Sequence, residues 1–135
     1  MSRRAVALAA VLGMLGVMAG AFGAHGLRPR VEPEALAWWK TGAQYQMIHA
    51  VALLVIALQP QDGILEARWR ARAVWSFALG TVVFAGTLYA MTLGGPRWLG
   101  AVTPVGGAAL IGGWAMTALA AWTARDRGPS VSDSV

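Results

Sequence analysis

The amino-acid sequence predicts an all-α integral membrane protein built as a four-helix bundle. Four long stretches of the 135-residue chain contain no charged side chain, namely residues 5–22, 41–58, 73–93 and 105–124. A helix needs about 20 residues, at a rise of 1.5 Å each, to cross a hydrocarbon core of roughly 30 Å. Composition agrees, because 57% hydrophobic and 13% charged residues depart in opposite directions from the roughly 45–50% and 25% of soluble domains. A soluble bundle of very apolar helices is the less favoured alternative.

The boundaries of the helices follow from charges and prolines. Pro33 suits the first turn of the second helix, so this helix begins before its membrane part at residues 41–58. Thr103 and Pro104 are typical of the N-cap and first turn of the fourth helix. The predicted helices are residues 5–24, 34–58, 73–93 and 105–124. Their connections are short, which leaves one domain over residues 1–124.

The distribution of positive charge predicts that both termini lie in the cytoplasm. With the N-terminus inside, seven arginines flank the inner ends of the spans and four cations flank the outer ends, as the positive-inside rule requires. The inner set is Arg3, Arg4, Arg68, Arg70, Arg72, Arg125 and Arg127, and the outer set is Arg28, Arg30, Lys40 and Arg97. The expected location is the cell inner membrane. Residues 125–135 are expected to form a disordered cytoplasmic tail.

The N-terminus also imitates a secretory signal peptide. Arg3 and Arg4 precede an apolar run, and the small residues 19–21 imitate a cleavage site. Cleavage would remove the first span alone. The membrane assignment therefore holds for either interpretation.

Small residues recur in the first and fourth helices at helical spacing. Steps of three and four residues place Gly13, Gly16 and Gly20 on one helix face. In lipid, close packing of backbones replaces the hydrophobic effect between helices. We expect packing inside one chain, with a dimer interface as the less favoured alternative. The expected packing positions are Gly13, Gly16, Gly20, Gly106, Gly107, Gly112 and Gly113.

The second helix is two-faced inside the membrane. At 100° per residue, Thr41, Tyr45 and His49 fall in one arc and Gln46 borders it. A polar stripe that faced lipid would lack hydrogen-bond partners, so we expect it to face the interior of the bundle. Two interpretations stay open: hydrogen bonds that fix helix register, or a site for a ligand, an ion or a proton.

Four motifs resemble one family. They are residues 20–27 (GAFGAHGL), 39–50 (WKTGAQYQMIHA), 84–89 (FAGTLY) and 103–107 (TPVGG). In this order, over about residues 5–122, the chain resembles the small bacterial membrane proteins of the domain of unknown function 423 family, and it is similar also to the eukaryotic transmembrane protein 256 family. The resemblance implies a four-span inner-membrane protein that keeps its first span and has no assigned activity. Thr87 and Gly42 depart from the family pattern without affecting this assignment.

Depth estimates gather the polar motif residues in the outer half of the membrane. At 1.5 Å per residue, His49 lies about 12 Å and Thr87 about 9 Å below the outer interface. The inner half has few polar side chains, which disfavours a channel or pump formed by one chain. We expect His49 to be neutral, with Tyr45 one turn away, Gln46 and Thr87 as its candidate hydrogen-bond partners. The expected cluster comprises His25, Thr41, Tyr45, Gln46, His49, Thr87, Tyr89 and Thr103.

The sequence carries no signature of an enzyme. It contains no cysteine, no carboxylate in the four charge-free stretches, and neither H-E-x-x-H nor G-x-S-x-G. A haem between His25 and His49 would need both imidazoles at one level, whereas their estimated depths differ by about 12 Å. We therefore expect no catalytic residue, metal or cofactor.

The connection from Gln59 to Arg72 is expected to meet the lipid surface. Basic residues beside an interfacial tryptophan favour anionic lipid head groups, with Arg68, Arg70 and Arg72 as the expected contacts. No nucleic-acid motif accompanies them, and no protein partner is indicated. The predicted function is a structural or accessory role in the membrane. The alternative is a small-ligand binding or transport component, acting alone or as an oligomer.

Overall fold

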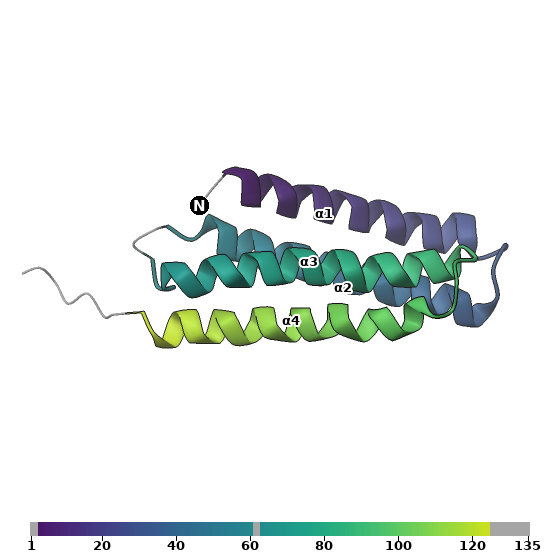
Figure 1. The fold of residues 1–135 in the computed structure, drawn as a ribbon. Helices are drawn as coiled ribbons and strands as arrows, with labels where there is room; N and C mark the ends of the chain where they lie inside the picture. The colour runs from purple at the N-terminus through teal and green to yellow at the C-terminus, as the bar shows by residue number, and fades with distance from the viewer. Residues whose placement is uncertain (1–2, 61–62, 125–135) are drawn as a thin grey trace, which may run out of the picture.

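The structure, a computed structural model, describes residues 3–60 and 63–124. Four α-helices follow one another: α1 (Arg3–Phe22), α2 (Pro33–Leu58), α3 (Ala67–Thr92) and α4 (Leu99–Trp122). A π-helical segment, η1 (Gly23–Leu27), continues α1 (Figure 1). Each helix is long and apolar enough to cross a membrane, so the predicted all-α fold class is confirmed. The tail expected at residues 125–135 lies outside the described residues.

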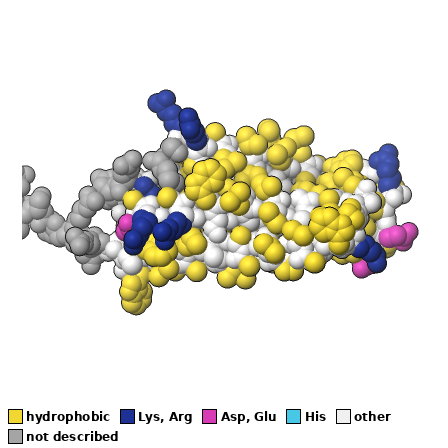
Figure 2. Space-filling view, viewed as in Figure 1, with side chains coloured by type: hydrophobic (Ala, Val, Ile, Leu, Met, Phe, Trp, Pro, Cys, Tyr) yellow, Lys and Arg dark blue, Asp and Glu magenta, His cyan; other side chains and the backbone are white. Residues whose placement is uncertain are grey.

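Consecutive helices pack side by side. α1 packs on α2, α2 on α3, and α3 on α4, and Figure 1 shows α1 and α4 on the two outer sides of this arrangement. The outer helices expose large apolar side chains, among them Val17, Ile111 and Trp122. In Figure 2 the lysines and arginines of the visible face gather at the two ends of the molecule, with hydrophobic side chains between them. This distribution suits a bundle whose middle lies in lipid.

Two helices begin six residues earlier than predicted, and the other two begin within two residues of the prediction. α3 begins at Ala67 rather than residue 73, because Glu66 caps it and accepts a hydrogen bond from the Trp69 backbone N–H at 3.2 Å. α4 begins at Leu99 rather than residue 105, so Pro104 lies inside the helix and Thr103 is not its N-cap. Charge-free stretches locate the membrane parts of helices, and a helix continues past the membrane wherever capping allows it.

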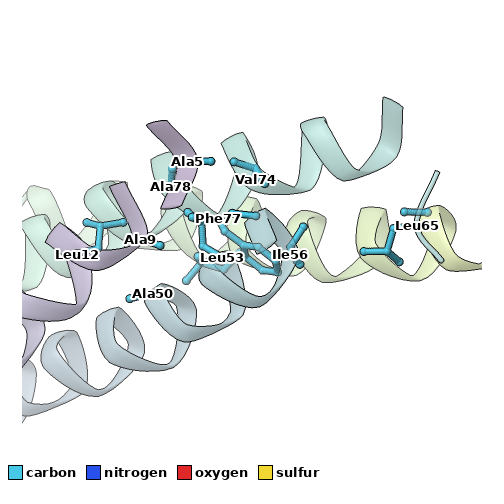
Figure 3. Packing of buried hydrophobic residues seen from close by; sticks show 13 residues of the cluster. Ala5, Ala9, Leu12, Ala50, Leu53, Ile56, Leu65, Val74, Phe77 and Ala78 are labelled. Carbon is cyan, nitrogen blue, oxygen red and sulfur yellow. The ribbon is translucent and has the colours of Figure 1, made fainter. Parts of the chain in front are cut away.

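The apolar core lies where α2 and α3 face each other. Leu53 and Phe77 are 0% exposed and belong to one apolar cluster with small side chains from α1, including Ala9 (Figure 3). Leu65, in the α2–α3 connection, belongs to the same core. Next to it, the Glu66 backbone N–H donates to the Ala120 carbonyl at 2.8 Å, which fixes this connection to the end of α4.

Two glycines of α4 make the closest contacts with α3. A Cβ at Gly106 would lie 2.5 Å from the Phe84 backbone nitrogen, and one at Gly113 would lie 2.6 Å from the Phe77 ring. Larger side chains at either position would push the helices apart. Gly107 and Gly112 lie at ordinary contact distance from Phe84 and Ser76.

The glycines of α1 differ in how closely they approach α2. Cβ atoms at Gly13 and Gly16 would come within 3.8 and 3.3 Å of α2 side chains, whereas one at Gly20 would meet nothing within 4 Å. The expectation that Gly20 packs against another helix is therefore wrong. The close approach occurs at Gly23 in η1, where a Cβ would lie 2.6 Å from the Trp39 ring. The closest approach to α2 therefore lies directly after the end of α1, outside the glycines predicted to pack.

Candidate functional site

The polar residues form three separate sets of interhelical hydrogen bonds rather than one cluster. The first set is centred on Gln46, the second on His49, and the third on Thr87. Each set joins helices that are adjacent in the bundle or bridges α2 to α4. Polar groups inside a membrane protein need such internal partners, because lipid offers none.

Gln46 joins three helices. Its amide Nε2 donates to the Leu12 carbonyl of α1 at 2.8 Å, and its Oε1 accepts from the Tyr89 hydroxyl of α3 at 2.8 Å. The side chain is 5% exposed. The Tyr89 ring reaches this position because Gly42 lacks a Cβ, which would lie 2.9 Å from the ring. Gln46 thus fixes the register of α2 against both of its neighbours.

Two further bonds near the same end were not expected from the sequence. The Trp39 indole N–H donates to the Ala19 carbonyl at 2.7 Å, and the Thr92 hydroxyl donates to the Ala35 carbonyl at 2.9 Å. The first ties α1 to α2 and the second ties α2 to α3. Only a general rule could have predicted the Trp39 bond: a tryptophan N–H usually finds a hydrogen-bond partner when the ring is buried.

His49 bridges α2 to α4. Its Nδ1 lies 2.7 Å from the Tyr45 carbonyl, and its Nε2 lies 3.2 Å from the indole nitrogen of Trp114. An indole N–H only donates, so Nε2 accepts and Nδ1 carries the hydrogen of a neutral imidazole. Of the expected partners, Tyr45 bonds to His49 through its backbone carbonyl, whereas Gln46 and Thr87 bond to other residues. Trp114 was missed because it is 65 residues away in sequence.

Aromatic rings surround the imidazole. The His49 ring centre lies 5.6 Å from that of Phe77 and 5.8 Å from that of Tyr45. Phe77 in turn meets Trp114 edge to face at 5.2 Å. These rings keep the imidazole 5% exposed, although Trp114 itself is 49% exposed.

The third set joins α3 to α4. The hydroxyls of Thr87 and Thr103 lie 2.8 Å apart, and each also reaches carbonyls of the preceding turn of its own helix. Deeper in the same interface, the Ser76 hydroxyl donates to the Ala109 carbonyl at 2.6 Å. Small and hydroxyl residues therefore share the α3–α4 interface.

Three residues of the expected cluster lie apart from it. Thr41 is exposed, and its hydroxyl donates to the Ala37 carbonyl at 3.0 Å within its own helix. Tyr45 is 41% exposed. His25 is exposed on η1. The expectation of an interior position is wrong for Thr41 and Tyr45, and His25 does not join the expected cluster.

Thr41 and Tyr45 lie outside the buried face of α2 for a physical reason. α2 is covered on two sides, by α1 and α3, so its buried face is centred on Gln46 rather than on the polar stripe. A threonine that bonds to the carbonyl one turn earlier needs no partner from another helix. Tyr45 lies at the edge of the buried face, where its ring packs on Phe84 at 4.6 Å.

Arg70 has a structural role in the α2–α3 connection. It is 3% exposed, and its Nη1 donates to the carbonyls of Gln59 and Pro60 at 2.9 and 2.6 Å. A cation at these carbonyls also complements the negative end of the α2 dipole. The expectation that Arg70 contacts lipid head groups is therefore wrong. Arg68 and Arg72 are exposed, and both guanidinium groups lie over the Trp69 ring, at 5.3 and 4.9 Å.

A groove of about 340 Å³ lies between α1 and α2, and Gln46, His49 and Thr87 are not among its lining residues. Gly20 forms part of its floor, and Lys40 and Gln44 are exposed at its edge. Its lining residues are Gly16, Val17, Gly20, Trp39, Lys40, Ala43, Gln44 and Met47.

A family model and individual relatives both match this chain, and the relatives are membrane proteins. The model of the family described as "Protein of unknown function (DUF423)" matches residues 19–107. The UPF0382 membrane protein YwdK of Bacillus subtilis is 40% identical over 116 residues, which cover 86% of this chain and 94% of that protein. The UPF0382 inner membrane protein YgdD of Escherichia coli K12 is 37% identical over 129 residues, which cover 96% and 97%. No solved structure matches the chain significantly.

Proposed function

We propose a structural or accessory role in the membrane for this chain, which belongs to the DUF423 family and is an integral membrane protein of unknown biochemical activity. The observation that carries the proposal is the bonding of Gln46. Both ends of its amide are occupied by groups of the same chain, on α1 and α3. His49 likewise has a protein partner at each ring nitrogen. Polar side chains used in this way hold helices in register.

Transport by a single chain has less support. Below His49, the bundle is filled by apolar residues such as Leu53, Ile56 and Phe77. An ion or proton path needs polar groups or water across the whole membrane. Among the described residues, two buried side-chain atoms lack a hydrogen-bond partner: the Thr81 hydroxyl inside α3 and Arg70 Nε near the start of that helix. One hydroxyl does not make a path.

We propose neither a catalytic activity nor a nucleic-acid partner for this chain. It includes contact with anionic lipid head groups through Arg68 and Arg72, supported by their exposure beside Trp69 at one end of the bundle. It also includes cytoplasmic termini in the cell inner membrane. The orientation is supported by the excess of arginines at the end that carries the start of α1 and the α2–α3 connection.

A flux measurement tests the proposed role. The full chain, reconstituted in vesicles with an internal pH dye, should conduct protons and potassium no faster than protein-free vesicles under an imposed gradient. Gln46→Leu should lower stability in the same preparation. Flux that His49→Leu abolishes while the variant stays folded would contradict the proposal and assign the chain to transport.

A further inference from the structure

The groove between α1 and α2 is left open by the protein itself. A Cβ at Gly20 would meet no atom within 4 Å, whereas one at Gly16, a turn deeper, would lie 3.3 Å from the Met47 side chain, so Gly16 marks the inner end of the groove. The Trp39 ring that forms one wall is held by its bond to the Ala19 carbonyl. The hollow is therefore part of the packing between the two helices, and rotation of this ring does not close it.

The groove runs along the membrane-spanning part of both helices. From Lys40 to Met47 it extends about 10 Å down α2, at 1.5 Å per residue. Ala43, Met47 and the two glycines give it an apolar floor. Water is excluded at this depth of a bilayer, so a hydrocarbon chain is the chemically matched occupant. Its volume of about 340 Å³ lies at the lower end of the roughly 300–1,000 Å³ typical of small-ligand sites.

The edge of the groove carries one cation and one amide at different depths. Lys40 lies nearer the membrane surface, and Gln44 follows one turn deeper, about 6 Å lower. The residues one turn before Lys40 on α2 are Leu36 and Ala37, so no neighbouring carboxylate neutralises the ammonium within its helix. A phospholipid presents its phosphate and its ester carbonyls in the same order.

We infer that this groove binds one anionic phospholipid, from the leaflet at the η1 end of the bundle. An acyl chain lies over Gly20 and Gly16, the Lys40 ammonium meets the phosphate, and the Gln44 amide donates to an ester carbonyl. The site is independent of the proposed structural role and of the arginines at the opposite end. The α1–α2 side of the molecule is then the side that selects an anionic lipid.

Native mass spectrometry of the full chain tests this site. The chain is released from vesicles of phosphatidylcholine with a minority of phosphatidylglycerol, and bound phosphatidylglycerol is counted. The parent should retain one such molecule that Gly20→Leu, which fills the floor, does not retain. Gly86→Leu is the matched control, since Gly86 is an exposed glycine of α3 whose Cβ would also meet nothing within 4 Å. It should retain the lipid.

The charged part is tested separately. Lys40→Gln should weaken phosphatidylglycerol retention about fivefold, the factor that corresponds to about 1 kcal/mol for one lysine near an anionic surface. Arg28→Gln, which removes an exposed cation from the same end, should not. Equal retention by Gly20→Leu and the parent would overturn the proposal, as would a dimer that Gly20→Leu dissociates. Equal retention of phosphatidylcholine and phosphatidylglycerol, unchanged in Lys40→Gln, would overturn the preference for an anionic lipid.

Discussion

Trp114 donates its indole N–H to His49 Nε2 at 3.2 Å, across 65 residues of sequence. α4 packs mainly on α3, so this bond is a direct tie between α4 and α2. It also fixes the tautomer of the imidazole, because the indole nitrogen cannot accept. The histidine that sequence reasoning singled out is thus part of a helix contact whose second member is an aromatic side chain.

The first prediction concerns this pair. Trp114→Phe should keep most of the ring packing and lose the hydrogen bond, at a cost of about 0.6–2 kcal/mol. His49→Leu should cost a similar amount, and the double variant should cost less than the sum of the two. Reversible unfolding in mixed detergent micelles measures all three. Strict additivity would show that the bond contributes nothing to stability.

The second prediction concerns Gln46. Gln46→Leu removes two interhelical bonds and leaves the Leu12 carbonyl and the Tyr89 hydroxyl without this partner. We expect a loss of about 1–3 kcal/mol in the same assay. Thr41→Val is the control, because the Thr41 hydroxyl bonds within its own helix. A control variant as unstable as Gln46→Leu would mean that any polar loss from α2 has this effect.

The third prediction concerns the α3–α4 contact. A methyl group at Gly106 would be forced against the backbone of Phe84, so Gly106→Ala should destabilise the bundle by about 1–3 kcal/mol. Gly86→Ala, on an open surface, should be neutral or slightly stabilising. Thermal melting in one detergent compares the two. Equal melting temperatures would mean that α4 moves outward at little cost.

The fourth prediction concerns acid sensitivity. The backbone N–H of Trp69, and then that of Arg68, hold the pKa of Glu66 below its ordinary value. A lowered pKa in the folded state contributes stability that is present above the unfolded pKa, near 4.3, and is lost as the pH falls through the folded pKa. The parent should therefore lose more stability than Glu66→Gln between neutral pH and about pH 3. Parallel melting curves for the two proteins over this range would contradict the capping role.

The fifth prediction concerns orientation. Alkaline phosphatase, which is active only outside the cytoplasm, should be inactive when fused after Val135 or in the α2–α3 connection. It should be active when fused in the 93–98 connection. Activity at the first two sites together would reverse the proposed topology.

The helices of this protein were predictable because their signals are local. A charge-free stretch of membrane length specifies a span wherever the chain later packs, and each of the four stretches lies in one helix apart from the last one or two residues of the third and fourth stretches. The ends were less predictable, as Glu66 and Pro104 show, because helices continue beyond the lipid. The predicted fold class was therefore correct, while the predicted first residues of α3 and α4 were each wrong by six residues.

The polar contacts were predictable only in part. Gln46, His49, Thr87, Tyr89 and Thr103 do bond across helix interfaces, but which residue meets which depends on the order of the helices in space. Periodicity along α2 does not reveal that two helices cover it, and so it placed Tyr45 inside. A glycine stripe likewise does not distinguish a packed face from an open one, as Gly20 shows.

The bond from the Glu66 N–H to the Ala120 carbonyl bears on the order in which the chain is completed. Ribosomes deliver the chain from its N-terminus, so the α2–α3 connection is synthesised more than fifty residues before the carbonyl that receives it. Until α4 has been inserted almost to its last residue, Leu65 and Glu66 lack their final neighbours. The Glu66 bond can therefore form only after the last span has been inserted. A chain that ends before residue 120 lacks the carbonyl that accepts from Glu66, so the start of α3 is not bonded to α4.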